Sequence, residues 1–240
     1  MKAACKRAAQ LPVFLIAILT LNSVPSVPEA HAVARSESLC PVLSSLVQTG
    51  DIVFIEIDNF FLTRVARILG GWANHLGIVI GEKHEGFTVA ESTIPVSRTS
   101  ALCKFLKRST NGLVAIRRYS GPIGPDENAR IKAEALARVG VLYDLKFNFD
   151  TKRQYCSKFV HEVFKFALNV ELGIIETLGE LHERAKTSPT YDDDMTFWKI
   201  YFTGEIPDEQ RIITPESLYR DDQLISVFDN SGEMSALRLR

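Results

Sequence analysis

A cysteine stands where the sequence begins an amphipathic helix. Apolar residues follow it at Val160, Val163, Phe164 and Ala167, which is the spacing of one helical face. Traced backwards, this face includes Cys156 in the first turn. There the helix dipole and free backbone N–H groups are expected to lower the thiol pKa below about 8.5 and to provide donors for an oxyanion. The position predicts a nucleophile, and a buried structural cysteine is the equally open alternative.

A histidine and a glutamate are the residues that could assist this thiol. His75 opens the apolar stretch 75–80, and Glu91 closes the next predicted strand, 87–91. If these strands form a hairpin with residue 80 opposite 87, residue 76 lies opposite 91 and the two side chains are neighbours. A carboxylate there would orient the imidazole and stabilise its protonated form. The alternatives are a hydrogen-bonded core histidine and an exposed carboxylate at a strand end.

Other titratable residues fit chemistry less well. His161 follows Cys156 by five residues, about 140° around a helix, so it is expected to be exposed. His84 and His182 are expected at the surface. Asp192-Asp193-Asp194 lacks the spaced ligands and glycine of a calcium loop and is interpreted as a solvated loop. The sequence contains no phosphate-binding glycine motif, HExxH or close cysteine pair, so no cofactor or metal is predicted.

The predicted elements are short strands flanking separate helices. They show no regular βαβ alternation, which favours an α+β fold with an antiparallel sheet packed against helices. The segment 187–210 is polar and marked by proline, and it is interpreted as an extended loop or insertion. The predicted strands are 51–57, 75–80, 87–91, 113–119 and 224–228, and the predicted helices are 40–47, 59–69, 125–139, the segment after 155 and a short one at 214–217.

The N-terminus has the layout of a secretory signal peptide. Three basic residues precede an apolar run from Leu11 to Leu21, and Ala30-His31-Ala32 offers a cleavage site. The run is shorter than the roughly 20 residues of a membrane span. We therefore expect residues 1–32 to be removed and 33–240 to form one catalytic domain, exported to the periplasm or the extracellular space, with no stable membrane span left. An uncleaved N-terminal anchor is the alternative.

Composition and cysteine content narrow the function further. The net charge of −1 and the 46% hydrophobic content describe a globular chain without a general attraction to nucleic acid. They do not indicate an oligomeric state. Cys40, Cys103 and Cys156 remain after signal cleavage, an odd number for an oxidising compartment. One hypothesis pairs Cys40 with Cys103 and leaves Cys156 free; three free thiols are the alternative.

These motifs, in their order and spacing, resemble the YiiX/YebB-like group, relatives of the NlpC-type cell-wall peptidases with a circularly permuted papain-like fold. In that group a strand histidine precedes a helix-start cysteine, the reverse of papain. The resemblance covers most of the chain after residue 32. It rests on Gly50-Asp51-Ile52-Val53-Phe54, His75-Leu76-Gly77-Ile78-Val79, Glu91, Tyr143-Asp144, Tyr155-Cys156-Ser157 and Thr214-Pro215.

The resemblance implies Cys156 as nucleophile, His75 as general base and Glu91 as the polar third residue. The chain departs from the group at Lys158, where an acid is common, and further along the helix, where Phe164 and Phe166 stand in place of a common tyrosine. Tyr155 and Tyr143 are then the candidates for an oxyanion or substrate contact.

For function, the resemblance implies an exported thiol-dependent hydrolase that cleaves amide bonds, with cell-wall peptides as the expected substrate. Two alternatives stay open. One is acyl transfer from a lipid, for which Phe60-Phe61-Leu62 beside Trp72 would line an apolar groove. The other is a non-enzymatic binding module on the same scaffold, favoured by the departures at Lys158 and at the tyrosine.

Overall fold

The computed structural model describes residues 39–59, 62–64, 66, 71–83, 86–188 and 190–232. The predicted signal peptide, residues 1–32, lies outside these ranges. Within them, no helix is both long enough and apolar enough to cross a membrane.

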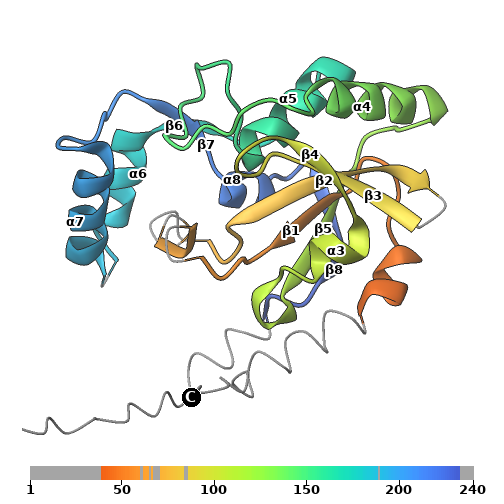
Figure 1. Cartoon of the computed structure of the whole chain (residues 1–240), viewed down its shortest axis with the longest axis horizontal. Helices are drawn as coiled ribbons and strands as arrows, with labels where there is room; N and C mark the ends of the chain where they lie inside the picture. Colours follow the sequence, from red (N-terminus) through yellow and green to blue (C-terminus); the bar gives the residue numbers. More distant parts are fainter. Residues whose placement is uncertain are drawn as a thin grey trace, which may run out of the picture.

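A six-stranded antiparallel sheet forms the centre of the molecule, in the order β4-β3-β2-β1-β5-β8 (Figure 1). A separate two-stranded ribbon pairs β6 with β7. The five predicted strands are confirmed as members of the large sheet. The strands are β1 (Ile52–Ile55), β2 (His75–Lys83), β3 (Gly86–Glu91), β4 (Arg98–Ala101), β5 (Val114–Tyr119), β6 (Ile175–Thr177), β7 (Arg211–Ile213) and β8 (Leu224–Asp229).

Helices cover both faces of this sheet and enclose a core on each. Leu76, Ile78 and Ile80 of β2 point to one face and pack beneath α5, whereas Val79 and Val89 point to the other and pack against α3. The α+β prediction is confirmed. The helices are α3 (Leu102–Leu106), a 3₁₀ turn (Thr110–Gly112), α4 (Pro125–Ala137), α5 (Cys156–Leu168), α6 (Leu178–Ala185), α7 (Tyr191–Phe202) and α8 (Pro215–Tyr219); residues 39–44, 62–64 and 66 are also helical.

The boundaries of α5 follow from its sequence. Tyr155, in an extended conformation, precedes the first turn, and Asn169 ends the helix in the left-handed region at φ 57°. Asparagine tolerates that conformation, and its backbone N–H bonds to the carbonyl of Lys165. Phe159 and Val163 are fully buried against the sheet. The predicted amphipathic helix therefore forms with Cys156 at its first residue.

The β2–β3 hairpin has a different register from the predicted one. Ile78 lies opposite Ala90, and Phe87 lies opposite Glu82 rather than residue 80, with a bulge between Val79 and Glu82. The strand does not end at Gly81, whose φ of 115° accommodates the irregularity. Because a one-residue slip exchanges the two faces of a strand, this register places Glu91 on the same face as His75. The predicted register would have separated them.

Gly77 makes room for that arrangement. It lies between the two side chains on their face of the sheet, where a Cβ atom would meet Val89 Cγ1 at 2.5 Å and Phe105 Cε2 at 3.1 Å. Without a side chain at residue 77, His75 and Glu91 can meet diagonally across the hairpin.

The segment 187–210 is not the extended loop that its polarity predicted. Its central part forms α7, which lies beside α6 at one side of the molecule in Figure 1. Asp192, Asp193 and Asp194 occupy the first turn, where negative charge stabilises the helix dipole. Aromatic side chains follow one another at helical spacing, and the Trp198 and Phe202 rings stack with their centroids 5.6 Å apart. Together, the acidic first turn and this aromatic face explain the helix.

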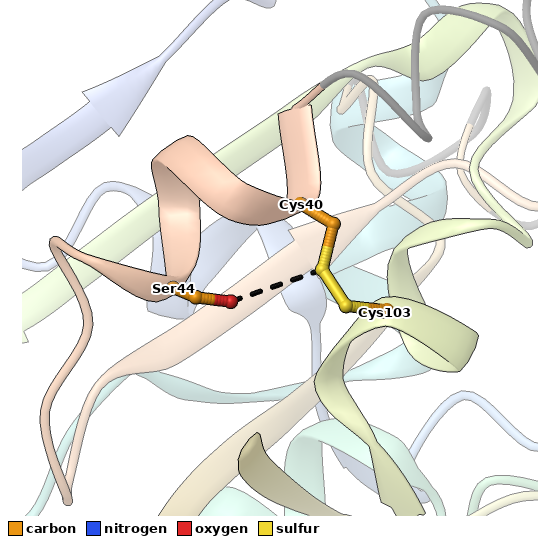
Figure 2. The surroundings of a disulfide bond; sticks show 3 residues. All are labelled: Cys40, Ser44 and Cys103. Carbon is orange, nitrogen blue, oxygen red and sulfur yellow. Dashed lines mark hydrogen bonds between the residues drawn. A yellow bond between two sulfur atoms is a disulfide. The ribbon is translucent and has the colours of Figure 1, made fainter. Parts of the chain in front are cut away.

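A disulfide bond joins Cys40 to Cys103, with a Cα–Cα distance of 5.4 Å (Figure 2). The Ser44 hydroxyl lies 3.8 Å from the Cys40 sulfur. The bond ties the N-terminal helical segment to α3, and Cys156 is the free thiol in the described part of the chain. The pairing hypothesis is thus confirmed in the structure.

Loss of this disulfide is expected to destabilise the fold. Because the bond spans 63 residues, the double substitution Cys40→Ser/Cys103→Ser should lower the free energy of unfolding by about 2–4 kcal/mol in guanidinium titrations. Peptide mapping without reduction should recover one peptide pair linked through these cysteines. Recovery of both as free thiols would contradict the pairing.

A side chain at Gly77 is expected to disturb the hairpin. Gly77→Ala should lower the free energy of unfolding by about 1–3 kcal/mol because the methyl group collides with Val89 and Phe105. Gly232→Ala is the matched control, since a Cβ there meets nothing within 4 Å. Equal stability of the two variants would show that Gly77 is not needed for close approach.

Candidate active site

The first turn of α5 is fixed to strand β7 through one residue. The Ile213 backbone N–H donates to the Tyr155 hydroxyl oxygen at 2.9 Å, and the Ser157 hydroxyl donates to the Ile213 carbonyl at 2.8 Å. The residues on either side of Cys156 therefore satisfy both polar groups of Ile213. This double contact holds the cysteine in place at the start of the helix.

The Cys156 thiol is 4% exposed and protonated in this state. Burial raises its pKa to about 11, while the backbone N–H groups of Leu76, Ser157 and Cys156 itself and the Tyr143 hydroxyl oppose this rise. The sequence-based prediction of a lowered pKa is therefore wrong for the resting thiol. The helix N-terminus does stabilise the thiolate, but desolvation outweighs it.

His75 and Glu91 form the second part of the site. The imidazole Nε2 lies 2.7 Å from Glu91 Oε2, and both side chains are almost completely buried. The His75 ring also stacks on Phe105 of α3, with ring centres 5.6 Å apart. The expectation that these residues are neighbours is confirmed.

Glu91 is an ionised carboxylate with donors on both oxygens. Oε2 accepts from His75 and from Arg108 at 2.6 Å, and Oε1 accepts from Ser100 at 2.7 Å and from Arg98 at 3.3 Å. The hydrogen bond from His75 and the positive charge of Arg108 hold the Glu91 pKa far below its usual range, although burial opposes them. Glu91 is fully buried, so the alternative interpretation, an exposed carboxylate at a strand end, is excluded.

The ionised carboxylate determines the tautomer of His75. Burial lowers the pKa of His75, so the ring is neutral at pH 7, even though Glu91 favours the charged form. Because ionised Glu91 can only accept, Nε2 must carry the hydrogen and Nδ1 must carry the lone pair. Within the described residues, Nδ1 takes part in no hydrogen bond and is free to accept a proton.

The thiol and the imidazole meet at the backbone of one strand. The N–H of Leu76, the residue after His75, faces the Cys156 sulfur. Nδ1 is the ring nitrogen nearer this backbone. No hydrogen bond joins the thiol to the ring among the residues that the structure describes. Such contacts are often long in unliganded enzymes and shorten when substrate binds.

The two candidate tyrosines have different surroundings. The Tyr143 hydroxyl lies beside the Cys156 thiol, and burial raises its pKa well above the usual value, so it remains a donor. The Tyr155 oxygen accepts the Ile213 N–H described above. A small pocket touches the thiol and is mostly apolar; it is lined by Leu62, Asn74, Tyr143, Phe147, Tyr155, Cys156, Ser157, Ile212, Ile213 and Pro215.

Several other sequence expectations can be compared with the structure. His161 is buried rather than exposed, because Phe149 packs on its ring and Nδ1 bonds to the Leu172 carbonyl at 2.7 Å. Asp194 is not solvated: it is buried in the first turn of α7 and accepts from the Thr190 hydroxyl at 2.7 Å. His182 is partly buried and its Nε2 contacts the Tyr191 hydroxyl. His84 lies outside the described residues.

Lys158, where the chain departs from the resembled group, is not part of the thiol's surroundings. Its ammonium group donates to the Arg153 carbonyl at 3.0 Å and lies 3.8 Å from Glu162. Phe164 is buried in the core and Phe166 is exposed. The structure also adds residues that the sequence did not single out: Arg98, Ser100 and Arg108 around Glu91. Arg98 and Ser100 lie in the short strand β4 and Arg108 lies in the turn after α3, and neither segment gives a periodic signal that could have identified them.

Comparison with known proteins agrees with this architecture. YiiX of Escherichia coli strain K12 is 25% identical over 188 residues, which cover 78% of this chain and 89% of the relative. The crystal structure of the metalloprotein yiiX from Escherichia coli O157:H7 superposes with a TM-score of 0.68 at 22% identity, covering 76% of this chain and 97% of that one. At that identity the second comparison supports the fold alone.

A family model described as the permuted papain-like amidase enzymes YaeF/YiiX, the C92 family, matches residues 46–228. The matched region begins just before β1, ends within β8, and contains Cys156, His75 and Glu91. It covers well over half of the sequence, and the chain therefore belongs to this family of permuted papain-like amidases.

Proposed function

We propose that this protein is a thiol-dependent amidase in which Cys156 is the nucleophile and His75 the general base. One observation carries the proposal: His75 points its protonated Nε2 at ionised Glu91, which leaves the Nδ1 lone pair available, and the next residue, Leu76, contacts the thiol through its N–H. Nucleophile, base and orienting carboxylate are the three groups that acyl transfer through a cysteine requires.

The protonation states favour general-base catalysis over a resting ion pair. Both the thiol and the imidazole are neutral before reaction. As Cys156 Sγ bonds to the substrate carbonyl carbon, its proton passes to His75 Nδ1, and Glu91 stabilises the resulting imidazolium. The imidazolium then protonates the leaving amine as the C–N bond breaks. Water, activated by the neutral ring, releases the acid from the thioester.

The donors around the thiol are suited to stabilise a tetrahedral oxyanion. The Cys156 and Ser157 backbone N–H groups and the Tyr143 hydroxyl all face the sulfur. A negative oxygen that forms on the carbon bonded to Sγ would lie within their reach. Tyr143 is thus our candidate oxyanion donor, whereas Tyr155 positions the helix through Ile213.

For the substrate, we propose an amide bond in a cell-wall peptide, reached after export directed by residues 1–32. The basic, apolar and small-residue pattern of that segment supports export. The apolar lining of the pocket, with Leu62, Ile212 and Pro215, is the observation that favours the second candidate, a lipid acyl group. Capture of an acyl chain on Cys156 from phospholipid, with no release from peptidoglycan fragments, would select the second candidate.

A metal has no part in the proposed reaction. The solved relative is described as a metalloprotein. Within the described residues of this chain, no three histidine, cysteine, aspartate or glutamate side chains are grouped so that they could hold a metal ion. The donors of the described residues therefore do not form such a site, and each step above uses the protein's own groups.

Removal of the thiol is expected to abolish turnover without unfolding the protein. Cys156→Ser should reduce kcat/KM for amide release from peptidoglycan fragments by on the order of 10³-fold or more. Mass spectrometry of the wild-type protein during turnover should detect an acyl group on Cys156 that hydroxylamine removes. Turnover by the serine variant at the wild-type rate would rule out this nucleophile, and inactivity of the wild type towards both peptides and lipids would favour a binding module.

The rate should fall on acidification because the base must be neutral. Since burial lowers the His75 pKa below 6.5, the acid limb of kcat/KM should lie below this pH. Glu91 raises that pKa, so Glu91→Gln should move the acid limb to still lower pH while reducing the maximal rate, because the ring loses its charged partner. Cys156→Ala provides the background rate. An acid limb that Glu91→Gln moves to higher pH would contradict this assignment.

A further inference from the structure

Arg108 approaches the His75–Glu91 pair from the side of α3. Its Nη2 lies 2.6 Å from Glu91 Oε2, the same oxygen that accepts from His75 Nε2 at 2.7 Å. Its guanidinium also lies over the Phe105 ring, 4.8 Å from the centroid, and the same ring stacks on His75. One carboxylate oxygen and one aromatic ring therefore link Arg108 to the proposed base.

The backbone that carries Arg108 is firmly held. Phe105 and Leu106 of α3 are fully buried, and the Arg108 N–H bonds to the Phe105 carbonyl at 3.2 Å. The neighbouring residue Ser109 bonds through its N–H to Leu106, and Cys103 is joined to Cys40 by the disulfide. Burial, backbone hydrogen bonds and the disulfide thus fix the backbone from which the Arg108 side chain extends.

Two positive charges face the pair, and they are not equivalent. The Arg98 side chain is 51% exposed and reaches Glu91 only at 3.3 Å, so water screens it. The Arg108 side chain is 26% exposed and makes the shorter contact. Lys104 of α3 and Lys107 just after it are exposed. On the α5 side, the groups are the neutral Cys156 thiol and the Tyr143 hydroxyl.

We propose that Arg108 is a positioning residue of the amidase reaction, which fixes Glu91 beside His75 and opposes protonation of the imidazole that accepts the thiol proton. The inference rests on the proposed function for its catalytic consequence. Without Arg108, the negative charge of Glu91 would stabilise the protonated His75 ring more strongly. Less of the neutral imidazole would then be available as a base in mildly acidic solution.

The sign of the effect follows from the charges. Arg108 repels a proton on His75 and so lowers the His75 pKa. Arg108→Gln removes that repulsion, whereas Glu91 remains ionised because His75, Ser100 and Arg98 still donate to it. The His75 titration should therefore move to higher pH, and the acid limb of kcat/KM should move with it. A purely structural arginine would change stability but not this midpoint.

The test combines an NMR titration of His75 with a pH–rate profile on the full chain. His75→Gln assigns the imidazole signal. Arg108→Gln should raise the His75 midpoint and move the acid limb of kcat/KM to higher pH by the same amount. Arg108→Lys, which retains the charge, should stay close to the wild type. Arg130→Gln, which removes an exposed arginine paired with Glu127 on α4, should change neither quantity.

Each outcome bears on the proposal. An unchanged or lowered His75 midpoint in folded Arg108→Gln overturns it. If the midpoint moves as expected but the wild type hydrolyses no amide, the proposed function fails while the control of His75 by Arg108 stands. If the wild type is active and Arg108→Gln leaves both the midpoint and the profile unchanged, only the role of Arg108 fails.

Discussion

The arrangement of this protein depends on a buried carboxylate that needs several donors. Glu91 is fully buried, and an ionised carboxylate in that position would be prohibitively costly without partners. His75, Ser100, Arg98 and Arg108 supply them from β2, β4 and the turn after α3. Because the donors arrive from three different elements, this one group constrains both the register of the sheet edge and the placement of α3.

The same carboxylate affects the proposed reaction through its hydrogen bond to His75. Accepting from Nε2 fixes the tautomer, so the base nitrogen faces away from Glu91. The thiol is held by an independent set of contacts, in which Tyr155 and Ser157 fasten the start of α5 to Ile213. The two halves meet where the Leu76 N–H faces the sulfur. Nucleophile and base thus belong to two separately held units that meet at the start of strand β2.

Much of this could be predicted from the sequence because its signals are local. The helical spacing after Cys156, the strand that starts at His75 and the order of the two residues led to the α+β fold and to the family. The spacing of 63 residues between Cys40 and Cys103 left their pairing open, and only the fold brings them together. The proximity of His75 and Glu91 was predicted from a hairpin, although the predicted register differed by one residue.

Other features were beyond the sequence because they arise from tertiary contacts. Desolvation of the Cys156 thiol depends on the residues that cover the first turn of α5. It raises the thiol pKa, whereas the helix dipole alone would lower it. His161 is buried by Phe149, which comes from a loop with no periodic pattern. Helix α7 was missed because its polar first turn resembles a loop. Arg98 lies in the short strand β4 and Arg108 in the turn after α3, and neither segment is long enough to produce a periodic signal.

The central claim is that the His75 Nδ1 lone pair serves the Cys156 thiol, and a crystal structure of a covalent adduct tests it most directly. A peptide aldehyde should form a hemithioacetal with Cys156. The account predicts that Nδ1 then lies within hydrogen-bond distance of the adduct, while Nε2 remains bonded to Glu91. An adduct whose polar atoms are contacted by another base, with the His75 ring turned away and bonded only to Glu91, would contradict it.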